Sequence, residues 1–352
     1  NTDYTRERSG EENKAEGVKA VKDTDDVLAL KRGNNDQVAH LFIAMARAAG
    51  MKAYVARVTD RDRSIFARQF LSLNQLDDDL AIVNVDGKDE YFDPGSRFCP
   101  YGHLEWKHAY AGGIRQTEGG TALFSTPQEP YTTSRTPRIG DLTMDEHGIV
   151  TGSIKMTYIG APALTWRQRS LTGDSASLEH ELRTSVEHLV PSGMDVKVLS
   201  IDNLADYEQP LTVNFSISGP IGQPTGKRLF VPGDIFEANA KVLFPDAKRD
   251  IPVYFDYPHM VQDAVRIKYP VGMTIESSPA PDKFEFKNFA LYNISTVPAA
   301  GSITVRRNFS LGEIIYLTKE YPDLCDFYSK ISTEDQENIV LTTAPAKTSA
   351  SN

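Results

Sequence analysis

The sequence has few cysteines, no long apolar run and no cluster of basic residues. Its 352 residues contain two cysteines, far apart, which excludes a dense disulfide framework but leaves open one bridge or two free thiols. No apolar run approaches the ~20 residues needed to cross a bilayer, and the polar first residues do not resemble a signal peptide. The net charge of -10 without a cationic patch argues against binding to nucleic acid. We therefore expect no nucleic-acid partner and no transmembrane segment in this chain.

The composition that remains is that of a globular protein. Hydrophobic residues make up 40% of the chain and charged residues 24%, which is enough apolar material for large cores. Because domains usually hold roughly 100–200 residues, the length predicts two or three domains.

The first part of the chain predicts a small α+β unit over residues 1–115. Apolar residues recur at helical spacing over 38–49, and Gly50 ends the helix. The predicted buried stripe consists of Val38, Leu41, Phe42, Met45 and Ala48. Strand-like runs follow, including a hairpin around Asp86-Gly87 whose returning strand ends at Asp93-Pro94.

The rest of the chain is predicted to be mostly β. Residues 116–137 are rich in Thr, Gly, Ser and Pro and are interpreted as a linker. Residues 138–247 predict a mixed β-rich domain with one helix, and 248–342 predict a β-sandwich with a terminal helix. Residues 343–352 are small and polar and predict a disordered tail.

The first unit resembles a known family. Gly33 precedes an Ala-His-Leu-Phe helix that ends Arg-Ala-Ala-Gly, and three strands follow, the last closing on Asp-Pro. This order resembles the papain-like core of bacterial transglutaminase-like proteins, which often carry β-rich modules of unknown function beside it. The resemblance implies a nucleophilic cysteine two residues after the glycine, a histidine base opening the second strand, and an aspartate at the Asp-Pro that orients the histidine.

Two of these three chemical positions hold other residues. The cysteine position falls on Asn35 and the histidine position on Leu80, whereas Asp93 keeps the expected type. A neutral carboxamide is a poor nucleophile, and a leucine cannot move a proton. The resemblance therefore implies a papain-like fold that has lost its acyl-transfer chemistry.

Three acidic or imidazole side chains near this helix and strand are candidates to replace the missing groups. Asp36, His40 and Asp93 could form an acid/base set, but simpler explanations exist for each. With Asn34 or Asn35 as the helix cap, Asp36 complements the dipole in the first turn, His40 is a helix residue one turn later, and Asp93 opens a tight turn. Asp77, Asp78 and Asp79 are interpreted as a solvated acidic turn. We predict no metal and no cofactor.

A second group lies in the segment "RFCPYGHLEWKH", which collects Cys99, His103, Trp106 and His108. It is too sparse for a zinc motif, and a thiol site at Cys99 with either histidine has little other support. A loop packed against the core is the simpler interpretation, although aromatic and imidazole groups beside an empty catalytic cleft would suit ligand binding.

Three functional hypotheses follow. The favoured one is an inactive transglutaminase-like module, a pseudoenzyme, that binds or scaffolds a peptide, glycan or protein partner. Its binding residues would come from Asn35, Asp36, His40, Asp93, Cys99, His103 and Trp106. The second is a cryptic hydrolase or amide-processing enzyme that uses Asp36, His40 and Asp93, or Cys99 with His103 or His108. The third is a structural spacer with a filled cleft. The resemblance alone implies a bacterial periplasmic or secreted location.

Overall fold

The computed structural model describes residues 10–17, 19–70 and 72–343, and the predicted tail at 343–352 lies outside them except for Thr343. The chain divides into two compact units. Unit 1 comprises Asn1–Glu129, Ala161–Ser175 and Ala205–Gln209, and unit 2 comprises Pro130–Gly160, Ala176–Leu204 and Pro210–Asn352. The fold is a mixed α+β arrangement, mostly of strands in several sheets. No described helix is long and apolar enough to cross a membrane.

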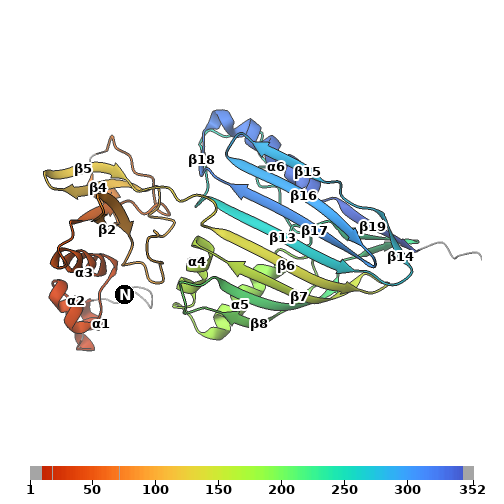
Figure 1. Cartoon of the computed structure of the whole chain (residues 1–352), viewed down its shortest axis with the longest axis horizontal. Helices are drawn as coiled ribbons and strands as arrows, with labels where there is room; N and C mark the ends of the chain where they lie inside the picture. The colour runs from red at the N-terminus through yellow and green to blue at the C-terminus, as the bar shows by residue number, and fades with distance from the viewer. Residues whose placement is uncertain (1–9, 18, 71, 344–352) are drawn as a thin grey trace, which may run out of the picture. The chain divides into compact units, whose positions relative to one another are not determined.

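Unit 1 is a five-stranded antiparallel sheet with one long helix on it (Figure 1). Its elements are α1 (Gly10–Ala15), α2 (Thr24–Leu30), α3 (Asn35–Ala48), β1 (Ala53–Val58), the 3₁₀ turn η1 (Leu73–Gln75), β2 (Asp78–Val85), β3 (Lys88–Phe92), β4 (Gly112–Thr117), β5 (Gly120–Ser125) and α4 (Ala161–Arg169). The strand order is β3-β2-β1-β4-β5. The predicted hairpin at Asp86-Gly87 is confirmed, with both residues at positive φ as a tight two-residue turn requires.

The predicted helix is confirmed as α3, but its buried face differs from the prediction. Ala39 and Ile43 are buried, and Ile43 packs with Phe92 and its neighbours on β1 and β2. Met45, which was predicted to be buried, is 59% exposed. The helix therefore contacts the sheet through a narrower stripe than its apolar residues suggested.

The two faces of the unit 1 sheet carry separate cores. Side chains alternate along β2, so Ala81 and Val83 face α3 whereas Leu80 and Ile82 face away from it. On that second face Leu80 and Ile82 pack with Leu104 and Ala109, which belong to the segment between β3 and β4. This segment lies against the sheet and brings its polar residues to the start of β2.

Residues 116–137 are not a plain linker. They contain the end of β4, all of β5, which pairs with β4, and the start of β6 (Arg135–Met144). Glu118 and Gly119 make the two-residue turn of this hairpin, and Gly120 opens β5 opposite Thr117. The glycines here belong to a tight turn within unit 1. The boundary between the two units falls later in the same range, between Glu129 and Pro130, so only this part of the predicted linker connects them.

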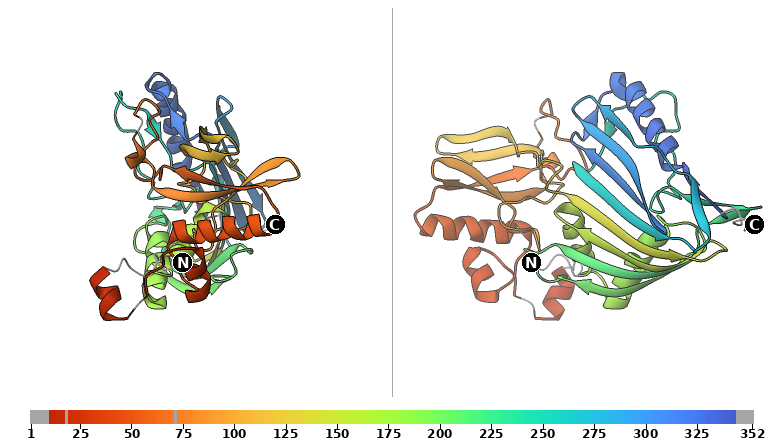
Figure 2. Two further views of the ribbon diagram at one scale, coloured as in Figure 1. Left: turned by 90° about the vertical axis from the view of Figure 1, so that its left-hand side faces the viewer. Right: turned by 45° about the vertical axis from the view of Figure 1, so that its right-hand side comes forward.

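Unit 2 is built on one eight-stranded sheet, in the order β15-β16-β17-β13-β6-β7-β9-β8 (Figures 1 and 2). The remaining strands of this sheet are β7 (Ile149–Tyr158), β8 (Asp195–Asp202), β9 (Leu211–Pro220), β13 (His259–Lys268), β15 (Asp282–Phe286), β16 (Ala290–Ala299) and β17 (Ser302–Leu311). Helices α5 (Ser175–Glu187) and α6 (Tyr321–Asp335) lie on the same face of the sheet. The helices predicted in these two regions are confirmed, but residues 138–247 hold a second helix, α4, where one helix was predicted.

The predicted boundary near residue 247 does not separate two sheets. β13 from the later segment pairs in parallel with β6 from the earlier one, so both contribute to one continuous sheet. A smaller four-stranded sheet contains β10 (Gln223–Thr225), β11 (Arg228–Pro232), β19 (Asn338–Thr343) and β14 (Met273–Ser277). A two-stranded ladder pairs β12 (Val253–Tyr254) with β18 (Ile315–Tyr316), and the 3₁₀ turn η2 (Thr318–Glu320) precedes α6.

Candidate functional site

The candidate site of unit 1 begins at the first turn of α3. Asn34 is the N-cap: its side chain accepts a hydrogen bond from the backbone N–H of Gln37 at 2.9 Å, and the Gln37 side chain accepts one from the Asn34 N–H at 3.0 Å. This reciprocal capping box fixes the start of the helix. Asn35, in the position expected for a nucleophile, is therefore the first helical residue.

The loop after β3 passes directly against Asn35. A Cβ atom on Gly95 would lie 2.5 Å from the backbone oxygen of Asn35 and 2.8 Å from its Cα. Such contacts are far inside van der Waals distance, so only glycine lets the two backbones approach this closely. The Asp93-Pro94-Gly95 turn thus places Asp93 beside the start of α3.

The residue that faces Asn35 is Asp78, and the placement of Leu80 at the site was wrong. The Asn35 side chain hydrogen-bonds the Asp78 carboxylate. Leu80 lies two residues further along β2 on the same face and is fully buried in the apolar core. The offset arises because the strand begins at Asp78 rather than at Leu80. The predicted solvated acidic turn is also wrong for Asp78 and Asp79, which open this strand.

His108 joins Asp78 to Asp93. Its ring is 1% exposed, its Nδ1 lies 2.6 Å from Asp93 Oδ2, and its Nε2 lies 3.1 Å from Asp78 Oδ2. Burial alone would lower the pKa of His108, but the negative charge of Asp93 and the hydrogen bonds to both carboxylates raise it to about 10. Burial also disfavours the charged form of Asp78, yet the pairing with His108 holds its pKa below the usual value. The imidazole is therefore a charged imidazolium at neutral pH, with both nitrogens donating.

The hydrogen bonds of His108 differ from those of the general base in a catalytic triad. A base must offer an unprotonated nitrogen to the group it deprotonates, and both ring nitrogens of His108 already donate to carboxylates. The position that would hold the nucleophile carries the Asn35 carboxamide. Asp78, His108 and Asp93 resemble a catalytic triad but form a hydrogen-bonded ion cluster. Together with the hydrogen bond from Asn35 to Asp78, the cluster joins α3, β2 and the end of β3.

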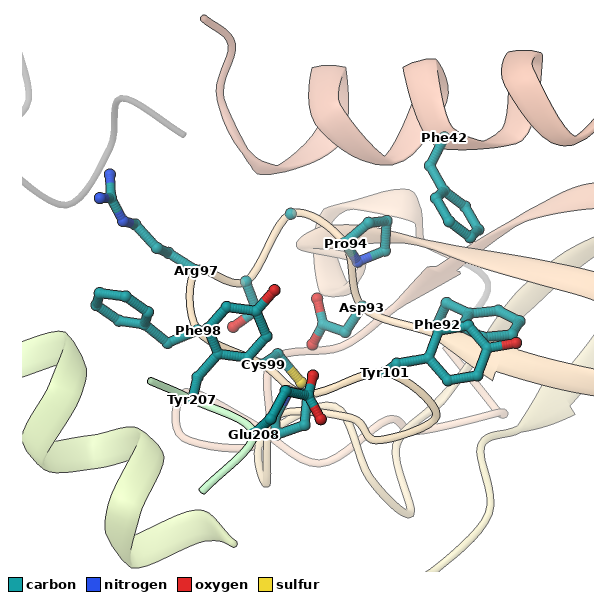
Figure 3. A pocket seen from close by; sticks show the side chains of 13 residues that line it. Phe42, Phe92, Asp93, Pro94, Arg97, Phe98, Cys99, Tyr101, Tyr207 and Glu208 are labelled. Atoms are coloured by element: carbon teal, nitrogen blue, oxygen red, sulfur yellow. The ribbon is translucent and has the colours of Figure 1, made fainter. Parts of the chain in front are cut away.

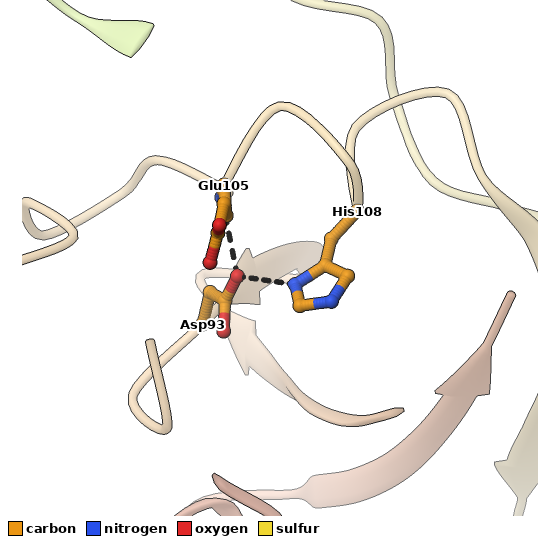
Figure 4. Close-up of side chains that lie close together, drawn as sticks. All are labelled: Asp93, Glu105 and His108. Carbon is orange, nitrogen blue, oxygen red and sulfur yellow. Dashed lines mark hydrogen bonds and ion pairs between the residues drawn. The ribbon is translucent and has the colours of Figure 1, made fainter. Parts of the chain in front are cut away.

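The cluster extends to Glu105. The Glu105 backbone N–H donates to Asp93 Oδ2 at 3.1 Å, and the Glu105 carboxylate accepts from the Ser96 hydroxyl. Candidate ligand atoms of Asp93, Glu105 and His108 lie within 4.8 Å of one another, as those around a metal ion would (Figure 4). A metal ion at Nδ1 of His108 would have to displace the proton of that nitrogen, which lies 2.6 Å from Asp93 Oδ2. The pKa of His108 is about 10, so losing this proton is unfavourable at neutral pH. The geometry fits an ion pair better than a metal centre.

Asp36 and His40 meet at Asp79 and not at Asp93. His40 Nε2 lies 2.8 Å from Asp79 Oδ2, and Asp36 accepts a hydrogen bond from the Asp79 backbone N–H at 2.9 Å. Asp79 points to the α3 face of the sheet, whereas Asp78 points to the opposite face. The acid/base set of Asp36, His40 and Asp93 is therefore not assembled.

The thiol of Cys99 lies in a setting that disfavours the thiolate. Burial, followed by the charges of Asp93, Glu105 and Glu129, raises the pKa of Cys99 well above its usual value. Its thiol donates to the backbone carbonyl of His103 at 3.4 Å, and the His103 ring pairs with Glu129 at 3.0 Å. His103 and His108 are thus each engaged with carboxylates rather than with the thiol. Trp106 packs under the guanidinium of Arg61, which lies 5.6 Å from its ring centroid.

A pocket of about 500 Å³ opens beside the ion cluster (Figure 3). Aromatic rings stand on two sides of it. Phe92 forms one side with Tyr101, at 5.0 Å between ring centroids, and Phe98 and Tyr207 form the other, at 6.3 Å. The polar groups that line the pocket include Asp93, Arg97, Cys99 and Glu208. Aromatic walls with a few converging polar groups are typical of ligand sites.

Of the residues predicted for the site, the pocket includes Asp93 and Cys99. Asn35 borders it through Gly95, while Asp36, His40, His103 and Trp106 do not line it. Sequence reasoning missed Tyr207 and Glu208, which lie about one hundred residues beyond Cys99 and carry no local signal. A pocket is therefore present beside Asp93, whereas the spacer hypothesis expected none.

Comparisons with known proteins give limited and distant matches. Residues 227–341 match DUF3858, described as a domain of unknown function with a solved structure. No curated protein matches the chain. The fold is similar to a crystal structure described as "a putative protease from Parabacteroides distasonis", with a TM-score of 0.47 and 14% sequence identity. The match covers 92% of this chain and 46% of the other, so the chain spans about half the length of that protein.

Proposed function

We propose that unit 1 is a non-catalytic module of the transglutaminase-like type that binds a peptide or glycan in its aromatic pocket. The observation that carries the proposal is the state of His108, an imidazolium held between Asp78 and Asp93 at the place where a triad would need a neutral base. The resemblance of the sequence to transglutaminase-like proteins supplies the expected location, the periplasm or the outside of the cell.

The pocket supplies the binding part of the proposal. Tyr101 is 74% exposed and Tyr207 is 42% exposed, so both rings offer a face to a ligand. Large apolar rings in solvent are unfavourable unless they serve a contact, and amphipathic aromatic side chains are the usual anchors in recognition sites. The carboxylate of Glu208 and the guanidinium of Arg97 add hydrogen-bonding groups for hydroxyls or peptide groups.

Two experiments test the two parts separately. For the absence of catalysis, the wild-type protein is treated with an alkyne-tagged iodoacetamide near neutral pH. We expect slow labelling of Cys99 that does not change in His103→Ala, because the thiol is not activated by an imidazole. Strong labelling of Cys99 that is abolished by His103→Ala or His108→Ala would overturn the non-catalytic assignment.

For binding, peptide and glycan arrays are probed with the wild type and the double variant Tyr101→Ala/Tyr207→Ala. Phe70→Ala is the matched control, since Phe70 is 64% exposed and does not line the pocket. Loss of one stacking contact costs about 0.5–1.5 kcal/mol, so we expect the double variant to bind about tenfold more weakly and the control to bind normally. Binding that the double variant keeps would exclude this pocket as the site.

A further inference from the structure

Unit 2 contains a second site, independent of the proposed function of unit 1, that starts from a row of buried charges. Arg138 on β6, Asp263 on β13 and Arg307 on β17 occupy directly paired positions on three neighbouring strands. Arg307 hydrogen-bonds Asp335 of α6, so this row lies on the side of the sheet that α6 covers, and all three residues are at least 94% buried. Charged residues are seldom placed in the middle of a sheet face unless they are paired.

The pairing is extensive. Arg138 donates through Nε and Nη2 to the two oxygens of Asp263, at 2.5 and 2.7 Å. Arg307 donates in the same two-point manner to Asp335 on α6, at 2.7 and 2.8 Å. Glu237 completes the cluster: its Oε1 lies 2.6 Å from Arg138 Nη2 and 3.5 Å from Arg307 Nη1.

The cluster has one more negative group than positive. Its two guanidinium groups face three carboxylates, those of Asp263, Asp335 and Glu237. Asp234 lies nearby, and burial and the charge of Asp263 raise its pKa well above the usual value. Buried ion clusters of this kind rarely stabilise a fold more than apolar packing would, so their presence suggests a binding role.

A cavity of about 530 Å³ lies over this cluster, within the range of small-molecule sites. Its floor includes Arg138, Glu237, Arg307 and Asp335. Its walls are largely apolar and include Leu243, Phe244, Val261, Phe309, Tyr328 and Ile331. The other charged residues that line it are Lys241, Asp246 and Asp326, which add a further negative charge.

We propose that this cavity binds an organic cation, a protonated amine on an apolar body, with the ammonium group at Glu237 and the body against Phe244, Phe309 and Tyr328. Glu237 Oε1 is engaged by the arginines, whereas Oε2 makes no hydrogen bond to the described residues. The arginines have little to offer an anion, since Arg138 and Arg307 direct Nε and Nη2 at carboxylates and stack over Phe236 and Tyr292. Nearly all residues involved belong to the segment that matches DUF3858.

The charge requirement is tested with three probes on one skeleton: 2-naphthylmethylamine, 2-naphthalenemethanol and 2-naphthoate. Calorimetric titration at pH 7 should give the order amine, alcohol, carboxylate, with the amine about tenfold or more tighter than the alcohol, as a charge-assisted hydrogen bond implies. Equal affinities for the three probes, a preference for the carboxylate, or no binding of the amine at millimolar concentration would overturn the proposal.

Two variants test where the ammonium group and the apolar body of the ligand bind. Glu237→Gln keeps the shape of the side chain but removes its charge, and we expect it to reduce amine affinity about tenfold while alcohol affinity is unchanged. Glu146→Gln is the matched control, because Glu146 is an exposed glutamate in the β6–β7 turn of the same unit. Ser332→Trp fills the cavity and replaces no charged residue, so it should abolish binding of all three probes. If Glu237→Gln does not fold, Ser332→Trp and the probe series still decide the matter.

The two native cysteines report which cavity is occupied, because Cys325 lines this cavity and Cys99 lines the pocket of unit 1. Saturating amine should slow alkylation of Cys325 by iodoacetamide and leave the rate at Cys99 unchanged. Protection of Cys99 alone would place the amine in unit 1 and refute the assignment. Because the two thiols are read separately by peptide mass mapping, failure here does not affect the test of unit 1.

Discussion

Replacing His108 with glutamine should destabilise unit 1 strongly. The substitution removes the positive charge between two carboxylates, of which Asp93 has a 3% exposed side chain and Asp78 a 19% exposed one. Removing one partner of a buried ion pair typically costs about 3–5 kcal/mol, because the remaining charge is left uncompensated. We expect His108→Gln to lower the free energy of unfolding of unit 1 by about that amount.

The same ion cluster predicts a pH dependence. The pKa of His108 is about 10 in the folded protein, against 6.5 for an unperturbed histidine, which represents the unfolded state. Below pH 6.5 both states are protonated and the stabilisation is complete. Between 6.5 and about 10 only the folded state keeps the proton, so stability falls as the pH rises, by up to about 1.4 kcal/mol per pH unit. The full difference between the two pKa values corresponds to a contribution of at most about 5 kcal/mol to the free energy of unfolding.

The assay is urea unfolding followed by tryptophan fluorescence at several pH values between 6 and 10. Both tryptophans, Trp106 and Trp166, belong to unit 1, so the signal reports this unit alone. His147→Gln is the matched control, because the His147 side chain is 78% exposed in a turn of unit 2. A loss below ~1 kcal/mol in His108→Gln, or an alkaline decline as steep in the variant as in the wild type, would refute the reasoning.

Three further predictions follow from the packing and the charge clusters. Gly95→Ala should destabilise unit 1 by about 1–3 kcal/mol in the fluorescence assay, because the added Cβ would overlap the backbone of Asn35. Gly119→Ala is the control and should be nearly neutral, since its Cβ would meet no atom within 4 Å. Equal effects of the two substitutions would contradict the close approach of Gly95 to Asn35. Asp335→Asn should lower the calorimetric transition of unit 2, by about 3–5 kcal/mol in free energy, because it leaves Arg307 buried without its two-point partner, and the tryptophan transition of unit 1 should not move; an unchanged unit 2 transition would argue against the cluster. Zinc ions at a moderate excess should not raise the unfolding temperature of the wild type, since His108 holds its proton; a rise that disappears in His108→Gln would identify a metal site at Asp93, Glu105 and His108.

Local signals made the helix and hairpins of the sequence predictable. The α3 helix has an asparagine cap with a glutamine three residues later and ends before Gly50, and each of these features acts within one turn. Asp86-Gly87 marks its hairpin for the same reason, since its positive φ angles favour these residue types. Elements with a local cause could be placed to within a few residues.

The chemistry depended on contacts between distant residues and could not be predicted. His108 meets Asp78 across 30 residues and Asp93 across 15, and its place is set by the fold of the segment after β3. Arg138 and Asp263 are 125 residues apart and become neighbours only because β6 and β13 pair in parallel. That same pairing merges the two predicted β domains into one sheet, which composition and turn signals could not reveal.

The strand register explains the misplaced site residue. Asp78 and Leu80 share a face of β2, so alternation alone allowed either to lie beside Asn35. Counting residues back from the Asp86-Gly87 hairpin placed Leu80 at the start of the strand, whereas β2 begins at Asp78 in the structure. The three triad positions thus hold the amide of Asn35 and the carboxylates of Asp78 and Asp93, and the imidazole comes from His108 in another segment.

The protonation state of His108 tests the central claim most directly. In a protein labelled with ¹⁵N-histidine, long-range proton–nitrogen correlation spectra report both ring nitrogens, and His108→Gln assigns the signal. We predict that at pH 8 both nitrogens of His108 carry protons and that the ring titrates with a pKa of about 10. A neutral ring at pH 8, with one free nitrogen and a midpoint near 6.5, would contradict the account and restore a usable base to the site.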